Sequence, residues 1–148
     1  MRIVERVRVI FVLMLAIGAA AAAQAAGPAT LQVGDANGAS ATFVSDRGAK
    51  AHALVLRTVQ AGVAGSRIEV AVDQDKKPVF SHVFAPGECK FGAGGSACEV
   101  TISARNAAYR TIVARFRRGR EVHVTVQDAG VTRMDQTASL GGFGTSLR

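Results

Sequence analysis

The feature of this chain that most constrains its fold is a strict alternation of apolar and polar residues. In the segment 121–128 three valines alternate with charged or polar residues, which places all three valines on one face of an extended strand. The same alternation recurs in two earlier segments, 67–73 and 98–103. A period of two is typical of antiparallel strands that bury one face and expose the other. The alternation therefore predicts an all-β fold.

Four less regular segments complete the set of expected strands: 40–45, 52–60, 79–84 and 133–140. Short stretches rich in turn-forming residues separate the strands, at 35–38, 46–48, 61–65 and 129–130. About seven short strands with turns between them predict an antiparallel β-sandwich or a barrel. The residues from 143 to 148 are expected to form a loose extension.

One segment, 107–118, departs from this rhythm. Its apolar residues follow the spacing of a helical face: Tyr109, Ile112, Val113 and Phe116. Asn106 is a favourable N-cap residue, and Gly119 stands where a helix commonly ends. We therefore expect one short amphipathic helix across an open edge or end of the sheets. A strand is the alternative, because residues 110–116 also alternate.

The N-terminus has the three parts of a secretory signal peptide. Arginines at positions 2, 6 and 8 precede an apolar run from 9 to 23, and small residues follow it. We predict cleavage after Ala25, which leaves residues 26–148 as a single domain in the periplasm or at the cell surface, without a transmembrane segment. The apolar run is short for a membrane span, although a retained anchor is the alternative.

Cys89 and Cys98 are the only two cysteines, and both lie in the part expected to be exported. In an oxidising compartment an isolated pair of this kind forms a disulfide. Closing so short a loop stabilises a fold by about 2–3 kcal/mol in the chain-entropy description. A redox-active pair would instead show the C-x-x-C spacing, so we predict a structural disulfide between Cys89 and Cys98.

The distribution of charge suggests a binding surface. The chain carries 18 Lys and Arg against 11 Asp and Glu, and the segment 105–120 contains six arginines without an acid. An exported protein rarely meets nucleic acid, so we expect an envelope or host protein, or an anionic envelope component such as lipopolysaccharide, as partner. We assign partner binding to Arg110, Arg117 and Arg118, which are suited to carboxylate and phosphate groups. A solvated helix face that keeps the protein soluble is the alternative.

The sequence offers little for catalysis or metal binding. The three histidines, at 52, 82 and 123, have no metal-ligand spacing. His82 and His123 each alternate with apolar neighbours, so both are expected on solvent faces. The segment 73–78 has two aspartates but lacks the rest of a calcium loop, and is expected to be a polar hairpin turn. No G-x-S-x-G elbow occurs. We therefore expect no enzyme and no cofactor; a small metal-binding module or hydrolase is the weaker alternative.

The second half of the chain, from residue 78 onward, resembles the invasion-associated locus B family of exported bacterial proteins. The resemblance is carried, in order, by Cys89 and Cys98, the segment 107–118, Gly-Arg-Glu-Val at 119–122 and Ser-Leu-Gly-Gly-Phe at 139–143. It implies an immunoglobulin-like β-sandwich connected with host colonisation or envelope function, and it brings no active-site residues. This chain departs from the family in having no Trp and one cysteine pair. A structural or stress-related envelope protein without a specific ligand is the alternative function.

Overall fold

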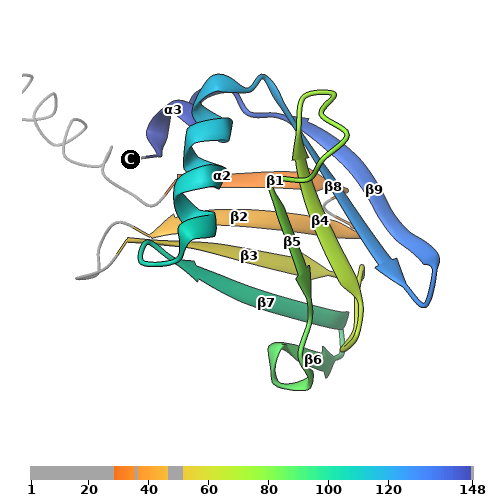
Figure 1. Cartoon of the computed structure of the whole chain (residues 1–148). Helices are drawn as coiled ribbons and strands as arrows, with labels where there is room; N and C mark the ends of the chain where they lie inside the picture. The colour runs from red at the N-terminus through yellow and green to blue at the C-terminus, as the bar shows by residue number, and fades with distance from the viewer. Residues whose placement is uncertain (1–28, 36, 47–51, 148) are drawn as a thin grey trace, which may run out of the picture.

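The computed structural model describes residues 29–35, 37–46 and 52–147, and these residues form two antiparallel sheets (Figure 1). In spatial order the first sheet contains β1 (Ala29–Gly34), β2 (Ser40–Asp46), β3 (Ala53–Val59), β7 (Gly95–Ser103) and β6 (Cys89–Gly92). The second contains β5 (Phe80–Val83), β4 (Arg67–Val72), β8 (Glu121–Asp128) and β9 (Val131–Ser139). A single 3-10 turn, η2 (Pro86–Glu88), joins β5 to β6. The signal peptide predicted over residues 1–25 lies outside the described residues.

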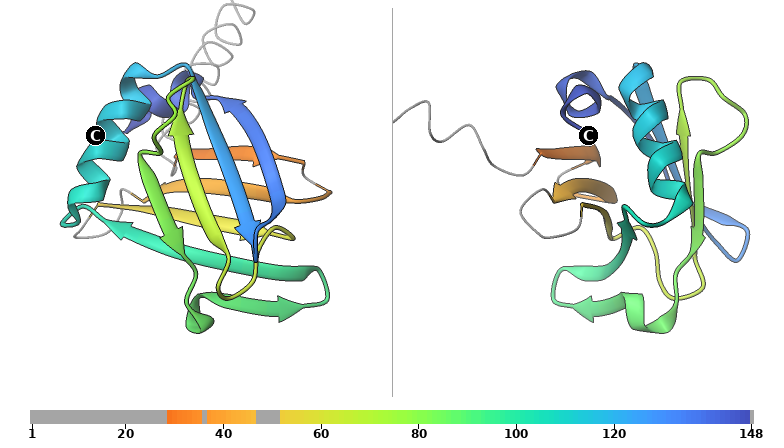
Figure 2. Two further views of the ribbon diagram at one scale, coloured as in Figure 1. Left: turned by 45° about the vertical axis from the view of Figure 1, so that its right-hand side comes forward. Right: turned by 60° about the vertical axis from the view of Figure 1, so that its left-hand side comes forward.

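The expected all-β antiparallel sandwich with one short amphipathic helix is confirmed. All paired strands are antiparallel, and the strands of the two sheets cross at a steep angle (Figures 1 and 2). β1, β2 and β3 are neighbours in chain order, and β3 pairs with β7. A constant-type immunoglobulin domain orders its four-stranded sheet A-B-E-D, so this chain has the layered sandwich architecture with a strand order of its own.

The alternating residues build the core between the sheets. In the second sheet Val70 lies opposite Val124, and in the first sheet Phe43 lies opposite Leu56. All four side chains are buried, because every second residue of a strand points to the same face. They belong to one hydrophobic core that also includes residues of the helix.

The segment predicted to be helical forms α2 (Ala107–Arg118), and the strand alternative is wrong. The Asn106 Oδ1 atom accepts a hydrogen bond from the Ala108 backbone N–H at 3.0 Å, which caps the first turn. At the other end the Gly119 N–H donates to the Arg115 carbonyl. The four residues expected to form the apolar face are all buried: Tyr109, Ile112, Val113 and Phe116. α2 lies beside β5 and covers one end of the first sheet (Figures 1 and 2).

The expectation of a loose C-terminal extension is wrong for residues 143–147. A short helix, α3 (Gly141–Ser146), places Phe143 and Leu147 in the core. The Phe143 ring lies 6.3 Å from that of Phe116 and 6.5 Å from that of Phe43, measured between centroids. Burial of these two side chains holds the segment against α2, which local sequence preferences do not reveal.

The predicted disulfide between Cys89 and Cys98 is present and joins two neighbouring strands. The two residues lie opposite each other in the β6–β7 hairpin, so the bond reinforces an existing strand pair. β6 and β1, the two edge strands of the first sheet, were not among the strands expected from the alternation. β6 lacks an apolar face, and the side chain of its Phe91 is 80% exposed.

Candidate functional site

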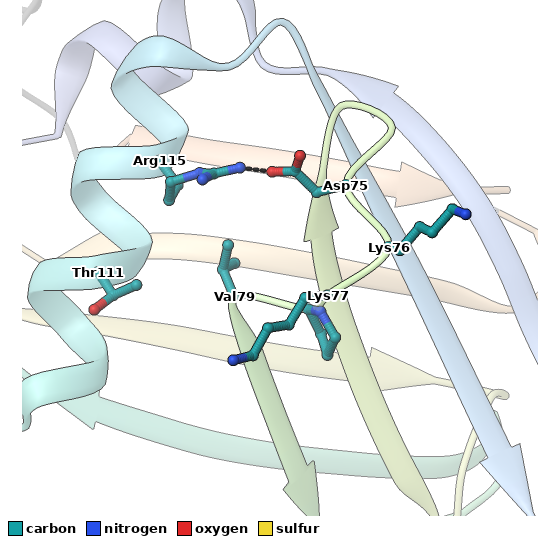
Figure 3. A pocket seen from close by; sticks show the side chains of 7 residues that line it. Asp75, Lys76, Lys77, Val79, Thr111 and Arg115 are labelled. Carbon is teal, nitrogen blue, oxygen red and sulfur yellow. Dashed lines mark ion pairs between the residues drawn. The ribbon is translucent and has the colours of Figure 1, made fainter.

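A groove separates α2 from the loop between β4 and β5, and it has a volume of about 530 Å³ (Figure 3). We call it the α2 groove. Its lining comes from two segments more than thirty positions apart in the chain: Asp75, Lys76, Lys77, Pro78, Val79, Thr111 and Arg115. The volume lies within the range of roughly 300–1,000 Å³ typical of ligand sites.

The loop that forms one wall of the α2 groove is fixed by Asp73. This residue has a φ of +56°, the left-handed conformation that aspartate tolerates in turns. Its Oδ1 atom accepts hydrogen bonds from the backbone N–H groups of Arg120 at 2.9 Å and Glu121 at 3.1 Å. The β4–β5 hairpin, expected from the sequence as a polar turn, is thereby tied to the junction between α2 and β8.

The same two hydrogen bonds hold the pKa of the Asp73 carboxyl below its ordinary value of 3.8, with smaller contributions from the nearby charges of Arg120 and Arg115. Because the folded pKa is lowered, the ionised carboxylate stabilises the fold above its unfolded pKa, and this contribution disappears as the pH falls through the folded value. The variant Asp73→Asn keeps an oxygen acceptor and tolerates the left-handed conformation, but it does not titrate.

We expect Asp73→Asn to lower the stability at pH 7, and this deficit to shrink as the pH falls to about 3. Urea denaturation of wild type and variant at both pH values measures the difference. A deficit that stays constant between pH 7 and pH 3 would contradict the role assigned to the Asp73 carboxylate.

The α2 groove is predominantly basic. Arg115 forms an ion pair with Asp75 across it, and the two side chains are 44% and 45% exposed (Figure 3). The Lys77 side chain extends along the groove between β5 and α2, whereas Lys76 points away from it (Figure 3). Asp75 is the single acid among the described residues that line the groove, and its charge is already matched by Arg115. The unmatched charge at this site is therefore positive.

The three arginines assigned to partner binding do not share one face of α2. At about 3.6 residues per turn, Arg118 falls on the same side as Thr111 and Arg115, whereas Arg110 and Arg117 lie on the opposite flank. The Arg117 Nε atom donates to the Leu147 carbonyl at 2.6 Å, so this side chain is engaged in holding the C-terminal segment. Arg110 and Arg118 are exposed and make no ion pair with the described residues.

Sequence reasoning missed the lysines of the α2 groove, because they come from a hairpin that only the fold brings to the helix. The available signal was the pair Lys76-Lys77 directly after Asp75. The expected polar hairpin turn over 73–78 is present, and in addition its lysines line the groove beside α2.

The structure corrects the placement of one histidine. His82 lies opposite buried Ile68 and between the rings of Phe80 and Phe84, which places it on the core side of β5. Its Nε2 atom lies 2.8 Å from the Oε1 atom of Glu88. The Ala85 backbone N–H, which donates to that carboxylate, and the His82 ring together lower the pKa of Glu88.

His123 lies on the outer face of the second sheet, as expected, and contacts Asp135. His52 is exposed at the start of β3. Within the described ranges, no three His, Cys, Asp or Glu side chains come together to hold a metal ion.

Two other hollows are less suited to a charged ligand. One, of about 560 Å³ near the disulfide, is lined by charges of both signs, and its Arg57 and Glu99 pair at 2.7 Å. The other, of about 230 Å³, lies beside Phe91. The α2 groove therefore combines the unmatched positive charge with a defined hollow.

Comparison with protein-family models, with curated proteins and with solved structures found no match. In the part of the chain that the structure describes, no helix is long and apolar enough to span a membrane.

Proposed function

We propose that this protein is an exported, non-enzymatic binding protein of the bacterial envelope, and that it holds an anionic partner in the α2 groove. The observation that carries the proposal is the gathering of Lys77 and Arg115 from two separate segments around one hollow whose single acid is already paired. The resemblance to invasion-associated locus B proteins and the signal-peptide pattern support the location in the periplasm or at the cell surface.

The groove suits a partner that presents carboxylates or phosphates. The Lys77 ammonium is free to follow the partner, while the Arg115 guanidinium is held in place by Asp75. An incoming anion competes with Asp75 for Arg115, because both offer oxygen acceptors to the same donor group. Asp75 therefore sets the affinity as well as the shape of the site. Since the groove is open to solvent, added salt should weaken binding.

Reversing one charge in the groove tests this proposal. We expect Lys77→Glu to weaken binding of polyglutamate or lipopolysaccharide about tenfold, because attraction is replaced by repulsion at close range. Lys90→Glu, on exposed β6 outside the groove, is the matched control and should leave binding unchanged. Calorimetric titration at low salt gives both affinities. Equal losses in the two variants would mean that the protein binds anions only through its overall charge.

Removing the acid should have the opposite effect. We expect Asp75→Asn to strengthen binding of the same probes about two- to fivefold, since it releases Arg115 and removes a repulsive carboxylate. Asp128→Asn is the control, because Asp128 faces Arg133 at 4.0 Å in a similar exposed pair outside the groove. An unchanged affinity in Asp75→Asn would exclude Arg115 as a contact residue.

The helix arginines are tested separately. Arg110→Glu and Arg118→Glu change exposed side chains, whereas changing Arg117 would also remove its hydrogen bond to Leu147. If Arg110→Glu weakens binding more than Lys77→Glu, the contact surface lies on the α3 side of α2. If none of these variants alters binding, the arginines form the solvated face that keeps the protein soluble.

A further inference from the structure

The outer edge of β5 is open beside the α2 groove. Sheet order makes β5 and β9 the edges of the second sheet and β1 and β6 the edges of the first, among the described strands. β1 and β9 contact each other, so these two edges are covered. β5 pairs with β4 on one side, and its other side, which faces α2, has no strand partner among the described residues (Figures 1 and 2).

The register shows which backbone groups of β5 face outward. The Phe84 N–H donates to the Ser66 carbonyl at 3.0 Å, and His82 lies opposite Ile68 in the same ladder. In an antiparallel pair the hydrogen-bonded positions alternate. Ser81 and Val83 therefore direct their N–H and C=O groups away from β4, toward a position that a further strand would occupy.

α2 is the element next to the outer edge of β5. Figure 1 and the left-hand view of Figure 2 show α2 beside β5, with β4, β8 and β9 following in order on the other side of β5. The α2 groove begins where the chain enters β5, at Pro78 and Val79. The groove therefore lies at one end of an unpaired strand edge, and such an edge accepts an extended peptide by strand addition.

The geometry points to a specific kind of partner: an extended, acidic segment of another protein that adds as a strand to the unpaired edge of β5, beside the α2 groove. This inference rests on the proposed function and names its partner class. Main-chain hydrogen bonds to Ser81 and Val83 hold the segment, and its acidic side chains contact Lys77, with Arg118 on the same side of the helix as the groove.

Charge complementarity favours an acidic protein segment over a second copy of this chain. A second copy of this chain would bring a net positive charge, with 18 Lys and Arg against 11 Asp and Glu, whereas an acidic segment complements the unmatched positive charge of the groove. The acidic residues of the partner should lie near Pro78, since Glu69 lies opposite Ser81 farther along the edge. The partner thus requires a negative charge at one end and extended backbone along the rest.

A pair of substitutions at one position tests strand addition. Ser81→Pro removes the outward N–H of the edge, and edge strands tolerate proline there because that N–H makes no ladder bond. Ser81→Ala keeps the N–H and is the matched control. The probe is a capped eight-residue peptide of alternating serine and valine with two glutamates at the end expected near Pro78, and a glutamine-for-glutamate peptide is its neutral counterpart.

We expect the glutamate peptide to shift backbone amide resonances of β5 and α2 and to protect the Ser81 and Val83 amides from hydrogen exchange. Ser81→Pro should weaken its binding about tenfold, Ser81→Ala should not, and the glutamine peptide should bind more weakly. If Ser81→Pro fails to fold, two methylated peptides replace it in the test. One carries N-methyl groups on its odd-numbered backbone amides and the other on its even-numbered ones. Only one of the two should lose binding to the wild-type protein, because only alternate amides of an added strand bond to β5.

The other outcomes separate this inference from the proposed function. In one outcome, Lys77→Glu abolishes peptide binding, but neither Ser81→Pro nor amide methylation affects it. This result would overturn strand addition and leave the proposal of an anion-binding groove in place. Binding of lipopolysaccharide without binding of the glutamate peptide would overturn the protein segment as partner. Shifts in β5 that depend on protein concentration alone would assign the edge to a second copy. Failure of the peptide, polyglutamate and lipopolysaccharide alike would overturn both proposals.

Discussion

Replacing Phe116 with alanine is expected to lower the free energy of unfolding by about 3–5 kcal/mol. The Phe116 side chain is fully buried, and its ring lies 5.4 Å from that of Phe43 in an edge-to-face arrangement. It also contacts Phe143, so one side chain joins α2 to the first sheet and to α3. The lost stability has two parts: the lost free energy of burying the phenyl ring, and the cost of the cavity left behind. The cavity stays open because α2, α3 and the first sheet surround it and cannot all move inward.

The control for this prediction is Phe91→Ala, the same chemical change at an exposed position. Phe91 is 80% exposed on β6, so its removal should change stability by no more than about 0.5 kcal/mol. Urea denaturation at pH 7 compares both variants with the wild type. Similar losses from the two substitutions would show that the three-phenylalanine cluster is not central to the core.

Gly144→Ala is expected to cost about 3 kcal/mol, the upper end for an overpacked position. A Cβ atom at residue 144 would overlap the Phe116 carbonyl oxygen, which is backbone and is already fixed within α2. The substitution therefore pushes α3 off α2 and exposes Phe143 and Leu147. Glycine is needed here for close approach between two helices.

Gly142→Ala is the matched control within the same short helix. A Cβ atom at residue 142 meets nothing within 4 Å. We expect this variant to be as stable as the wild type, or more stable by up to about 1 kcal/mol, because alanine favours helix over glycine. Thermal or urea denaturation distinguishes the pair, and equal stabilities for the two variants would exclude a tight contact between α3 and α2.

The contrast between α2 and α3 shows which helices can be predicted from local sequence. α2 was predictable because its own residues supply a cap, an apolar stripe and a terminating glycine. α3 contains three glycines among its six residues, which is unfavourable for a helix. It forms because Phe143 and Leu147 are buried against residues distant in the chain. Tertiary packing decides its conformation, and no local pattern contains that information.

The alternation also contains the information needed to place His82 on the correct face of its strand. His82 has the same parity as Phe80 and Phe84, so the sequence already places all three on one side of β5. The expectation of a solvent face treats the apolar neighbours Val79 and Val83 as the buried set, whereas Phe80 and Phe84 share the face of His82. In the structure the ring stacks on Phe80 and satisfies its nitrogen with Glu88, which makes the core side acceptable.

The candidate site was the least predictable feature. A cluster of arginines in the sequence identified α2 as basic, but it did not show that Arg115 pairs with Asp75 or that Arg117 bonds the Leu147 carbonyl. Both contacts join segments thirty or more positions apart. These contacts separate Arg115 and Arg117 from the arginines of α2 that remain exposed without an ion pair among the described residues. Because the contacts depend on tertiary structure, the sequence alone does not reveal this difference.

The strand order also determines the order in which the chain can fold. Each sheet is joined at its centre by strands far apart in the chain: Ala53 of β3 lies opposite Ser103 of β7, and Arg67 of β4 opposite Gln127 of β8. The chain enters the second sheet before the first is finished, so we expect both sheets to form in one cooperative step. Proteins dominated by such distant contacts fold in milliseconds to seconds. Because β8, β9 and the buried residues Phe143 and Leu147 come last in the described chain, the core cannot close until residues up to 147 are available.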